Sequence, residues 1–398
     1  MSAPPAASVP FALALDYAFA GGTGTAPAPV AGTAELDAER LVLLPSSGSP
    51  LPVPLLEILS ITGESHALRL TLASGGTLAL SRLGARFEDF LQMLTRARNE
   101  ALLDAFWMRE EPAAPPVGAE LATRPAGRPC ELRLLETALV VLFPDADPVR
   151  LPYALTDSIR TENYRVVLEV RWKGVWHFAR LGRGFDPFVD ALARATNSLH
   201  ASHLDLIRKT LPGLDAAVLR NAGALLRDGV AVPVAALDAA GLWGPLEQAA
   251  AAAGASEELA VLKGMADPLS WRAGIKRGLA APLSGDYLFF LVPLGEGGRA
   301  AALETVRMGD GAEEADGRAT YLFRLDGMHD LDALNRDLLE LNFRREPLLV
   351  PQEKLPRRRP AALETLRGRL LGRAVHRSPE GWKAGILALT QTREKGTH

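Results

Sequence analysis

The sequence predicts a mixed α+β protein containing tandem small antiparallel β-barrels or sandwiches, each closed by a C-terminal helix. The stretch RLGARFEDFL at 82–91 recurs 98 residues later as RLGRGFDPFV at 180–189, and the alternating apolar segment 68–72 recurs as 166–170. This separation is too long for a solenoid repeat, whose period is about 20 to 50 residues, and indicates a duplicated domain. The matched positions are Leu83, Gly84, Phe87 and Phe90, and then Leu181, Gly182, Phe185 and Phe188.

The first of these domains is expected at 1–112. Short apolar segments separated by Pro, Ser and Gly clusters predict strands. The spacing then changes, because Phe87, Phe90, Leu91, Leu94 and Ala97 follow the i, i+3, i+4, i+7 rule and predict a helix that packs on the sheet. The predicted strands are 40–44, 55–61, 67–73 and 77–81, after a weaker one at 9–19.

The second domain is expected at 113–212. Residues 110–129 are rich in Pro and Ala and are predicted to form a linker. A helix is predicted at 186–209, with Pro187 in its first turn, where the missing N–H is harmless. The predicted strands are 131–135, 139–143, 149–153, 165–171 and 175–180.

These segments carry a family resemblance. The sequence VRLPYALTDSI at 149–159, the extended pair around Trp172-Lys173-Gly174, and the Leu-Gly-x-x-Phe start of the helix resemble the pleckstrin-homology-like (PH/GRAM-type) superfold as bacteria carry it. The resemblance covers 35–99 and 130–203. It implies a recognition domain for lipids, peptides or proteins, with no catalytic residues.

Lipid-binding members of that superfold hold phosphates with several basic residues on the first two strands. Here the corresponding segments offer only Arg40 and Arg133. Because several cations are needed to replace the hydration of a phosphate, the sequence argues against specific phosphoinositide capture.

The remainder of the chain differs in pattern. Residues 213–282 predict a helical module, with helices at 216–226 and 245–253 and an extended piece at 230–234. Residues 283–356 predict a third strand-rich α+β segment, which is either a degenerate pleckstrin-homology-like copy or an unrelated α+β module. Its predicted strands are 287–293, 301–308 and 319–325, followed by a helix at 330–343.

Composition restricts the class of protein. The chain has 398 residues, 48% hydrophobic and 23% charged, and a net charge of −3, so no global attraction to nucleic acid or anionic membrane is expected. Cys130 is the single cysteine, which fits a reducing compartment. Residues 1–11 contain no Lys or Arg, and no run of 18 apolar residues occurs, so we expect a cytoplasmic protein.

Candidate catalytic and metal sites are few. His200, His203 and Asp205 lie near one helix face, but no further ligand follows at a recognisable spacing. Cys130 opens a strand, and no Gly-x-Ser-x-Gly elbow occurs. The glycine-rich 21–25 lacks a P-loop Lys, and the acidic 310–316 lacks the spacing of a calcium loop. We therefore expect a non-enzymatic protein without a metal or cofactor.

The C-terminal residues 357–398 are predicted to form a basic tail. Between 354 and 377, Glu364 is the single acidic residue, and a basic amphipathic helix can bind anionic surfaces. We expect an adaptor or scaffold that recognises a protein partner, with peripheral binding to anionic membrane or nucleic acid through 354–377 as the alternative. The candidate binding residues of the tail are Arg357, Arg358, Arg359, Arg367, Arg369 and Arg373.

Overall fold

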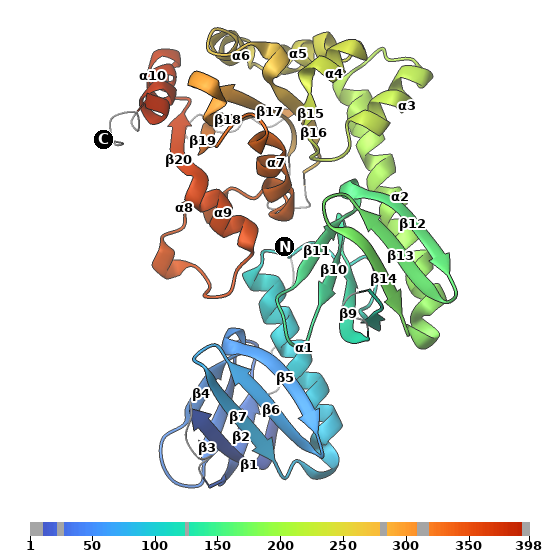
Figure 1. Ribbon diagram of the computed structural model, residues 1–398, viewed down its shortest axis with the longest axis vertical. Coiled ribbons are helices and arrows are strands. Elements are labelled where there is room, and N and C mark those ends of the chain that lie inside the picture. The colour runs from blue at the N-terminus through green and yellow to red at the C-terminus, as the bar shows by residue number, and fades with distance from the viewer. Residues whose placement is uncertain (1–10, 22–27, 124–126, 279–284, 309–317, 392–398) are drawn as a thin grey trace. The chain divides into compact units, whose positions relative to one another are not determined.

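The computed structural model describes residues 11–21, 28–123, 127–278, 285–308 and 318–391. These residues form a mixed α+β protein with three antiparallel sheets, two of seven strands and one of six (Figure 1). The chain divides into two compact units. Unit 1 comprises Met1–Leu151, Asp157–Val189 and Lys354–Arg359, and unit 2 comprises Pro152–Thr156, Asp190–Glu353 and Pro360–His398.

The first sheet belongs to unit 1 and has the strand order β4-β3-β2-β1-β7-β6-β5. Its strands alternate buried and less buried residues, as in β7, because one face packs on an apolar core. The strands are β1 Phe11–Gly21, β2 Val30–Leu36, β3 Arg40–Pro45, β4 Leu51–Pro54, β5 Ile58–Glu64, β6 Ala67–Leu72 and β7 Gly76–Ser81.

The second sheet repeats this topology in the order β11-β10-β9-β8-β14-β13-β12. The prediction of a linker at 110–129 was wrong, because β8 lies within it and pairs with both β9 and β14. Ladder hydrogen bonds on both sides override its Pro/Ala-rich surroundings. The strands are β8 Val117–Leu121, β9 Arg128–Leu134, β10 Ala138–Leu142, β11 Val149–Pro152, β12 Thr156–Glu162, β13 Arg165–Val170 and β14 Gly174–Ala179.

Neither seven-stranded sheet closes into a barrel, so the expectation of closed barrels was wrong. Among the described strands, β4 does not pair with β5, nor β11 with β12. In β4 the reason is chemical, since Pro52 and Pro54 have no N–H with which to extend a ladder. Both sheets therefore keep two edges.

The two sheets have matching turns. Arg82 and Arg180 have φ of 60° and 57°, and Gly84 and Gly182 both have φ of 56°, a region that glycine enters freely. The ring of His66 meets Phe87 edge-on at 5.5 Å, and 98 residues later Tyr164 meets Phe185 at 5.8 Å. The same local geometry thus leads from the last strand into the helix that follows each sheet.

Helix α1 (Phe87–Ala105) serves both sheets of unit 1. Its first half, with Phe90 and Leu94, completes the core of the first sheet. Its last turns, with Leu102, pack with Val140 and Leu142 of β10. Because one rigid helix joins two apolar clusters, it fixes them at a set distance.

Helix α2 (Phe185–Thr210) follows the second sheet and was predicted at 186–209. Phe188 in this helix and Leu181 just before it are both buried, as expected for core positions. Phe185 is only half-buried, whereas its counterpart Phe87 is buried. The assumption that both rings lie in closed cores therefore holds for Phe87 alone.

The third sheet lies in unit 2, and its order, β15-β16-β17-β18-β19-β20, follows the chain. One face packs on helices through an apolar cluster that includes Trp243, Trp271, Phe290 and Trp382. Helix α7 lies on the opposite side of this sheet from α4, α5 and α6 (Figure 1). The strands are β15 Val232–Pro233, β16 Arg272–Lys276, β17 Asp286–Leu294, β18 Ala300–Met308, β19 Ala319–Arg324 and β20 Leu370–Val375.

The order in which strands pair in this sheet differs from that in the first two sheets. The first strand of each seven-stranded sheet pairs with the last, whereas here the strands pair only in sequence. This difference favours an unrelated α+β module over a degenerate third copy. The helices are α3 Ala216–Leu225, α4 Val234–Ala239, α5 Trp243–Ala252, α6 Ser256–Lys263, α7 Asp330–Glu340, α8 Glu346–Leu349, α9 Ala361–Arg369 and α10 Pro379–Gln391.

The residues predicted to form a tail are part of the fold. Strand β20 pairs with β19 at the edge of the third sheet, and Leu363 and Leu366 of α9 are fully buried. Trp382 of α10 donates to the Thr320 hydroxyl at 2.7 Å and stacks on His376. The leucines between the arginines are buried in the core, so apolar burial, rather than the local positive charge, determines where this segment lies. In the described residues, no helix has the length and apolarity needed to cross a membrane.

We predict that Phe90→Ala lowers the free energy of unfolding by about 3 to 5 kcal/mol, because a fully buried ring leaves a cavity. Phe185→Ala should lower it by only about 1 to 2 kcal/mol, because that ring is less completely buried. Urea unfolding of the purified variants measures both. Equal losses would contradict the difference in burial.

Candidate functional site

The free edge of β5 in the first sheet is covered by other parts of unit 1. The Ile61 N–H points away from β6 and donates to the Pro144 carbonyl at 3.1 Å. Pro144 lies in the turn after β10, so this turn supplies one backbone carbonyl to the edge of the first sheet.

Arg98 of α1 completes this coverage. Its buried guanidinium donates to the carbonyls of Ile58, Leu59 and Phe143 at 2.9, 2.8 and 3.0 Å. Burial lowers the pKa of Arg98 to about 10, and the charge of Arg358 acts in the same direction. The side chain stays protonated at neutral pH and bridges α1, β5 and the end of β10.

Strand β12 has the same place in the second sheet, but its edge is exposed. Asp157 and residues 159–162 are exposed. Ile159, at the position equivalent to Ile61, is 38% exposed, whereas Ile61 is buried. Thr196 replaces Arg98 at the equivalent helix position, and its hydroxyl bonds back to the Leu192 carbonyl of its own helix. The Thr196 hydroxyl is thus engaged within its own helix, unlike the Arg98 guanidinium.

An exposed aromatic residue lies at one end of this edge. Tyr164, in the turn from β12 to β13, is 83% exposed and has φ of 56°. Its ring touches the half-buried Phe185. The edge strand β12 thus presents exposed residues and accessible apolar surface, a combination that is typical of a contact for another chain.

The basic residues predicted as a binding surface are mostly engaged within the chain. In unit 1, Arg357 pairs with Glu57 at 2.7 Å, and Arg358 pairs with Asp147 at 2.5 Å and also donates to the Ile58 carbonyl. Arg359 donates to the Pro356 carbonyl at 2.9 Å.

In unit 2, one guanidinium nitrogen of Arg367 donates to the carbonyls of Pro347, Leu348 and Val350. Arg369 lies 3.7 Å from a carboxylate oxygen of Asp330. Arg373 is exposed. Of the six arginines singled out in the sequence, five have partners that hold the C-terminal segment in place.

Unit 2 contains a buried charged cluster around Asp228. Lys276 donates to one Asp228 oxygen at 2.8 Å, and the Arg277 N–H donates to the other at 2.7 Å. The imidazole of His203 lies 3.8 Å from the same carboxylate, and its Nε2 is 2.5 Å from the Leu226 carbonyl. Although burial opposes it, the Lys276 charge and these bonds hold the pKa of Asp228 below its ordinary value.

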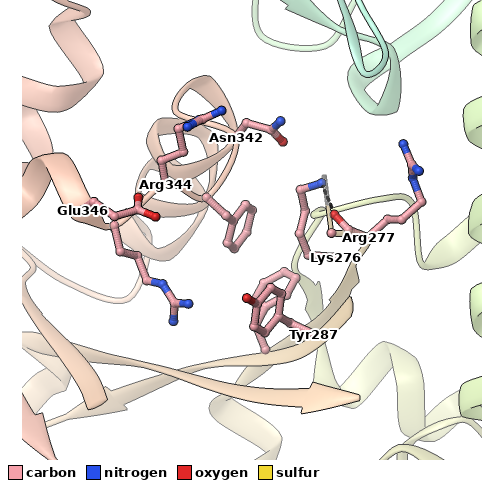
Figure 2. A pocket seen from close by; sticks show the side chains of 10 residues that line it. Lys276, Arg277, Tyr287, Asn342, Arg344 and Glu346 are labelled. Carbon is pink, nitrogen blue, oxygen red and sulfur yellow. Dashed lines mark hydrogen bonds between the residues drawn. The ribbon is translucent and has the colours of Figure 1, made fainter. Parts of the chain in front are cut away.

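A cavity of about 70 Å³ opens beside this cluster (Figure 2). Lys276, the last residue of β16, and Arg277 form one wall of this cavity. The segment after α7 forms the other wall, and Tyr287 of β17 lies at the bottom of the view in Figure 2. Phe343 packs on Phe289 with ring centroids 4.8 Å apart. The residues labelled in Figure 2 are Lys276, Arg277, Tyr287, Asn342, Arg344 and Glu346.

A second cavity, of about 370 Å³, adjoins the first and shares Arg345 and Glu346 with it. Arg345 donates to the Thr305 hydroxyl at 2.6 Å, and its guanidinium lies over the rings of Tyr287 and Tyr321 at 5.5 and 5.6 Å. These contacts hold the charge of Arg345 in a fixed position. Arg373 and Leu349 also line this second cavity.

The residues weighed from sequence as a metal or acid–base cluster, His200, His203 and Asp205, have different surroundings. His200 and Asp205 are exposed, and Asp205 pairs with Arg208 at 2.8 Å, whereas His203 is buried beside Asp228. Nowhere in the described residues do three or more His, Cys, Asp or Glu side chains form a group able to hold a metal ion. Residues 22–25 of the glycine-rich segment 21–25 and the acidic segment 310–316, weighed as phosphate and calcium loops, lie outside the described residues.

Cys130 is not placed as a nucleophile. It is buried in β9, and burial raises the pKa of its thiol to about 12. Because the thiolate is the reactive form, this cysteine is inert near neutral pH.

Sequence reasoning missed Arg98, Asp228, Lys276 and Arg345. Two signals were present. One basic pair, 276–277, lies at the end of strand β16, and another, 344–345, lies in the loop between α7 and α8. Binding residues often lie in such loops. Arg98 falls inside the repeated helix at a position where the repeat itself is broken.

Neither protein-family models nor curated proteins give a match to this sequence. The function is therefore inferred from the geometry of the chain itself.

We predict that Arg98→Met lowers the free energy of unfolding by about 3 kcal/mol or more, because three carbonyls lose a charged donor. Thr196→Val, at the equivalent position, should change it by less than about 1 kcal/mol. Urea unfolding compares the two. Near-neutral behaviour of Arg98→Met would contradict the role of this side chain.

We predict that acidification below about pH 6.5 destabilises unit 2 through His203. Burial lowers the pKa of His203, so the unfolded chain takes up its proton first, and stability that is complete above pH 6.5 declines as pH falls. In His203→Leu the free energy of unfolding should vary less between about pH 7 and pH 5.5. His200→Leu, at an exposed position one turn earlier, should retain the dependence. Identical pH profiles for the two variants would refute the assignment.

Proposed function

We propose that this chain is a non-enzymatic adaptor or scaffold whose tandem pleckstrin-homology-like domains recognise a protein partner. The supporting architecture is a pair of seven-stranded antiparallel sheets, each followed by a helix. The resemblance of 35–99 and 130–203 implies recognition rather than catalysis. We further propose that an extended segment of the partner pairs with β12.

The observation that carries this proposal is the contrast between β5 and β12. In the first sheet, the outward N–H of Ile61 is satisfied by the Pro144 carbonyl. From the shared strand order and the 98-residue repeat, we expect the N–H groups of Ile159 and Thr161 to point away from β13 in the same way. The partner segment would supply to Ile159 the carbonyl that Pro144 supplies to Ile61.

The energetics of such a contact follow from its two components. Backbone hydrogen bonds along an edge strand give affinity, and side chains beside the edge give specificity. Ile159 offers apolar surface in the middle of the strand, and Tyr164 offers a ring at its end. Burial of Ile159 on binding contributes stabilisation in proportion to its apolar area.

The alternative, peripheral binding to anionic membrane or nucleic acid through 354–377, has less support. Such binding needs cations that face solvent together, whereas Arg357, Arg358, Arg367 and Arg369 have partners in the chain. Removal of 354–398 would delete β20 and α10, so that truncation mainly tests folding.

A photo-crosslinking amino acid placed at position 159 or 59 tests the β12 proposal in the native cell. Leu59 is a matched control, because it lies on the covered edge strand β5 and is 37% exposed. We expect one defined protein adduct from position 159 and none from position 59. Equal labelling from both positions would show that β12 has no special role.

Thr161→Pro provides the complementary test. Proline removes an outward N–H without breaking the ladder to β13, so it should reduce binding of the crosslinked partner at least about tenfold while the melting temperature stays near wild type. Arg160→Ala, which keeps the backbone donors, is the control. A partner that binds Thr161→Pro as tightly as wild type would rule out strand pairing.

A further inference from the structure

A buried cluster of charged side chains lies where the C-terminal segment 370–391 meets the rest of unit 2. His376 follows β20 directly, and its side chain is only 6% exposed. Its Nδ1 lies 3.4 Å from a carboxylate oxygen of Glu258 in α6, and its Nε2 lies 3.3 Å from one of Glu304 in β18. One imidazole thus lies between two largely buried carboxylates, where water screens charges little.

The hydrogen bonds of Thr320 determine that Nε2 carries a hydrogen. The indole N–H of Trp382 donates to the Thr320 hydroxyl oxygen at 2.7 Å, and the hydroxyl itself donates to the Glu304 carboxylate. A hydroxyl has a single proton to donate. Thr320 can therefore only accept from the His376 Nε2, which lies 3.1 Å from its oxygen.

The opposite ring nitrogen, Nδ1, faces an oxygen atom that accepts hydrogen bonds. A neutral imidazole with its hydrogen on Nε2 would direct the lone pair of Nδ1 toward the Glu258 carboxylate, and two acceptors 3.4 Å apart repel each other. A second proton, on Nδ1, turns this repulsion into attraction. The contacts of both ring nitrogens therefore fit an imidazolium ion and neither neutral tautomer.

The charges of the cluster also balance only when the ring is protonated. Glu258 and Glu304 contribute two negative charges, and the Arg318 guanidinium, 3.1 and 3.8 Å from them, contributes one positive charge. Within the part of the chain that the structure describes, no other Arg or Lys lies within ion-pair distance of either carboxylate. An uncompensated buried charge is costly, and an imidazolium brings the cluster to neutrality.

Further contacts join this ring to the C-terminal segment. The His376 ring stacks on Trp382 of α10 with centroids 4.7 Å apart, and an indole face attracts a cation. The His376 N–H donates to the Arg318 carbonyl at 3.1 Å. Trp382 and Ile386 of α10 are buried in the apolar cluster of the third sheet. The charged cluster and the apolar contacts therefore hold the same segment.

We propose that His376 is a proton-dependent latch, which holds β20 and α10 on unit 2 while its ring carries a proton on both nitrogens. Closure of the segment takes the Nδ1 proton from the solvent, and opening returns it. Loss of this proton leaves two buried carboxylates opposite one guanidinium. The segment then opens more readily and uncovers the apolar surface that Trp382 and Ile386 cover. This device is separate from the β12 edge and does not depend on the adaptor function.

The direction of the pH dependence follows from the proton balance. The imidazole of an opened, solvated segment releases its proton at about pH 6.5, whereas the closed segment retains it. Above that pH, closure is coupled to proton uptake, so the closed state loses stability as pH rises. His203 acts in the opposite direction and below about pH 6.5, so the two effects fall in different pH ranges.

Nitrogen NMR of the full chain with isotope-labelled histidine measures the proton directly. The ring signals of His376 are assigned by their contacts with the Trp382 indole. At about pH 7.5, where an ordinary histidine is mostly neutral, we expect the spectrum of a doubly protonated ring. In Glu258→Gln the ring should be neutral, because the carboxylate that faces Nδ1 is gone. A neutral ring in the wild-type protein, or an imidazolium that persists in Glu258→Gln, would overturn the proposal.

Hydrogen exchange, corrected for its intrinsic pH dependence, measures the opening of the segment. Between about pH 6.5 and pH 8.5, the protection of β20 and α10 amides should fall at least about tenfold, because opening releases one proton. Glu258→Gln should remove most of this pH dependence. His329→Gln, which changes an exposed histidine of unit 2, should retain it. The same pH dependence in Glu258→Gln as in the wild-type protein would show that His376 is not a latch.

Discussion

The Arg98 guanidinium is the constraint on which the arrangement of unit 1 depends. It is buried, so each of its donors needs an acceptor, and the carbonyls of Ile58, Leu59 and Phe143 provide them from two different sheets. A shift of β5 against β10 would leave a charged group in an apolar environment without its hydrogen bonds. One side chain of α1 therefore ties β5 of the first sheet to the end of β10 in the second.

The two equivalent edge strands differ in their surroundings. In the first sheet, β5 makes hydrogen bonds with Pro144 and Arg98 and is part of the internal structure of unit 1. In the second, most residues of β12 are exposed, and the helix position equivalent to Arg98 holds Thr196, whose hydroxyl bonds within its own helix. Two copies of one topology therefore differ at the same edge.

Much of the fold could be predicted from local patterns. Strands β17, β18 and β19 and helices α1, α2 and α7 were predicted within a few residues, because their apolar periodicity is strong. Strands β2, β4, β8, β12, β16 and β20 were missed, because their stability comes from neighbouring strands rather than from their own sequence. The sites were harder still. Lys276 and Asp228 are 48 residues apart, and no short-range pattern connects a buried lysine to a distant aspartate. The C-terminal arginines looked like a surface for anions, because sequence alone does not show which carbonyls and carboxylates they meet.

The two prolines of β4 have a consequence for the behaviour of this protein in solution. An unprotected edge strand is a template for self-association, in which a second molecule adds its own strand and the process continues into cross-β assembly. Pro52 and Pro54 leave β4 with carbonyls but too few donors to accept such a strand. At high concentration the chain is therefore protected at the β4 end of its first sheet, where a second molecule finds no row of donors to which a strand can be added.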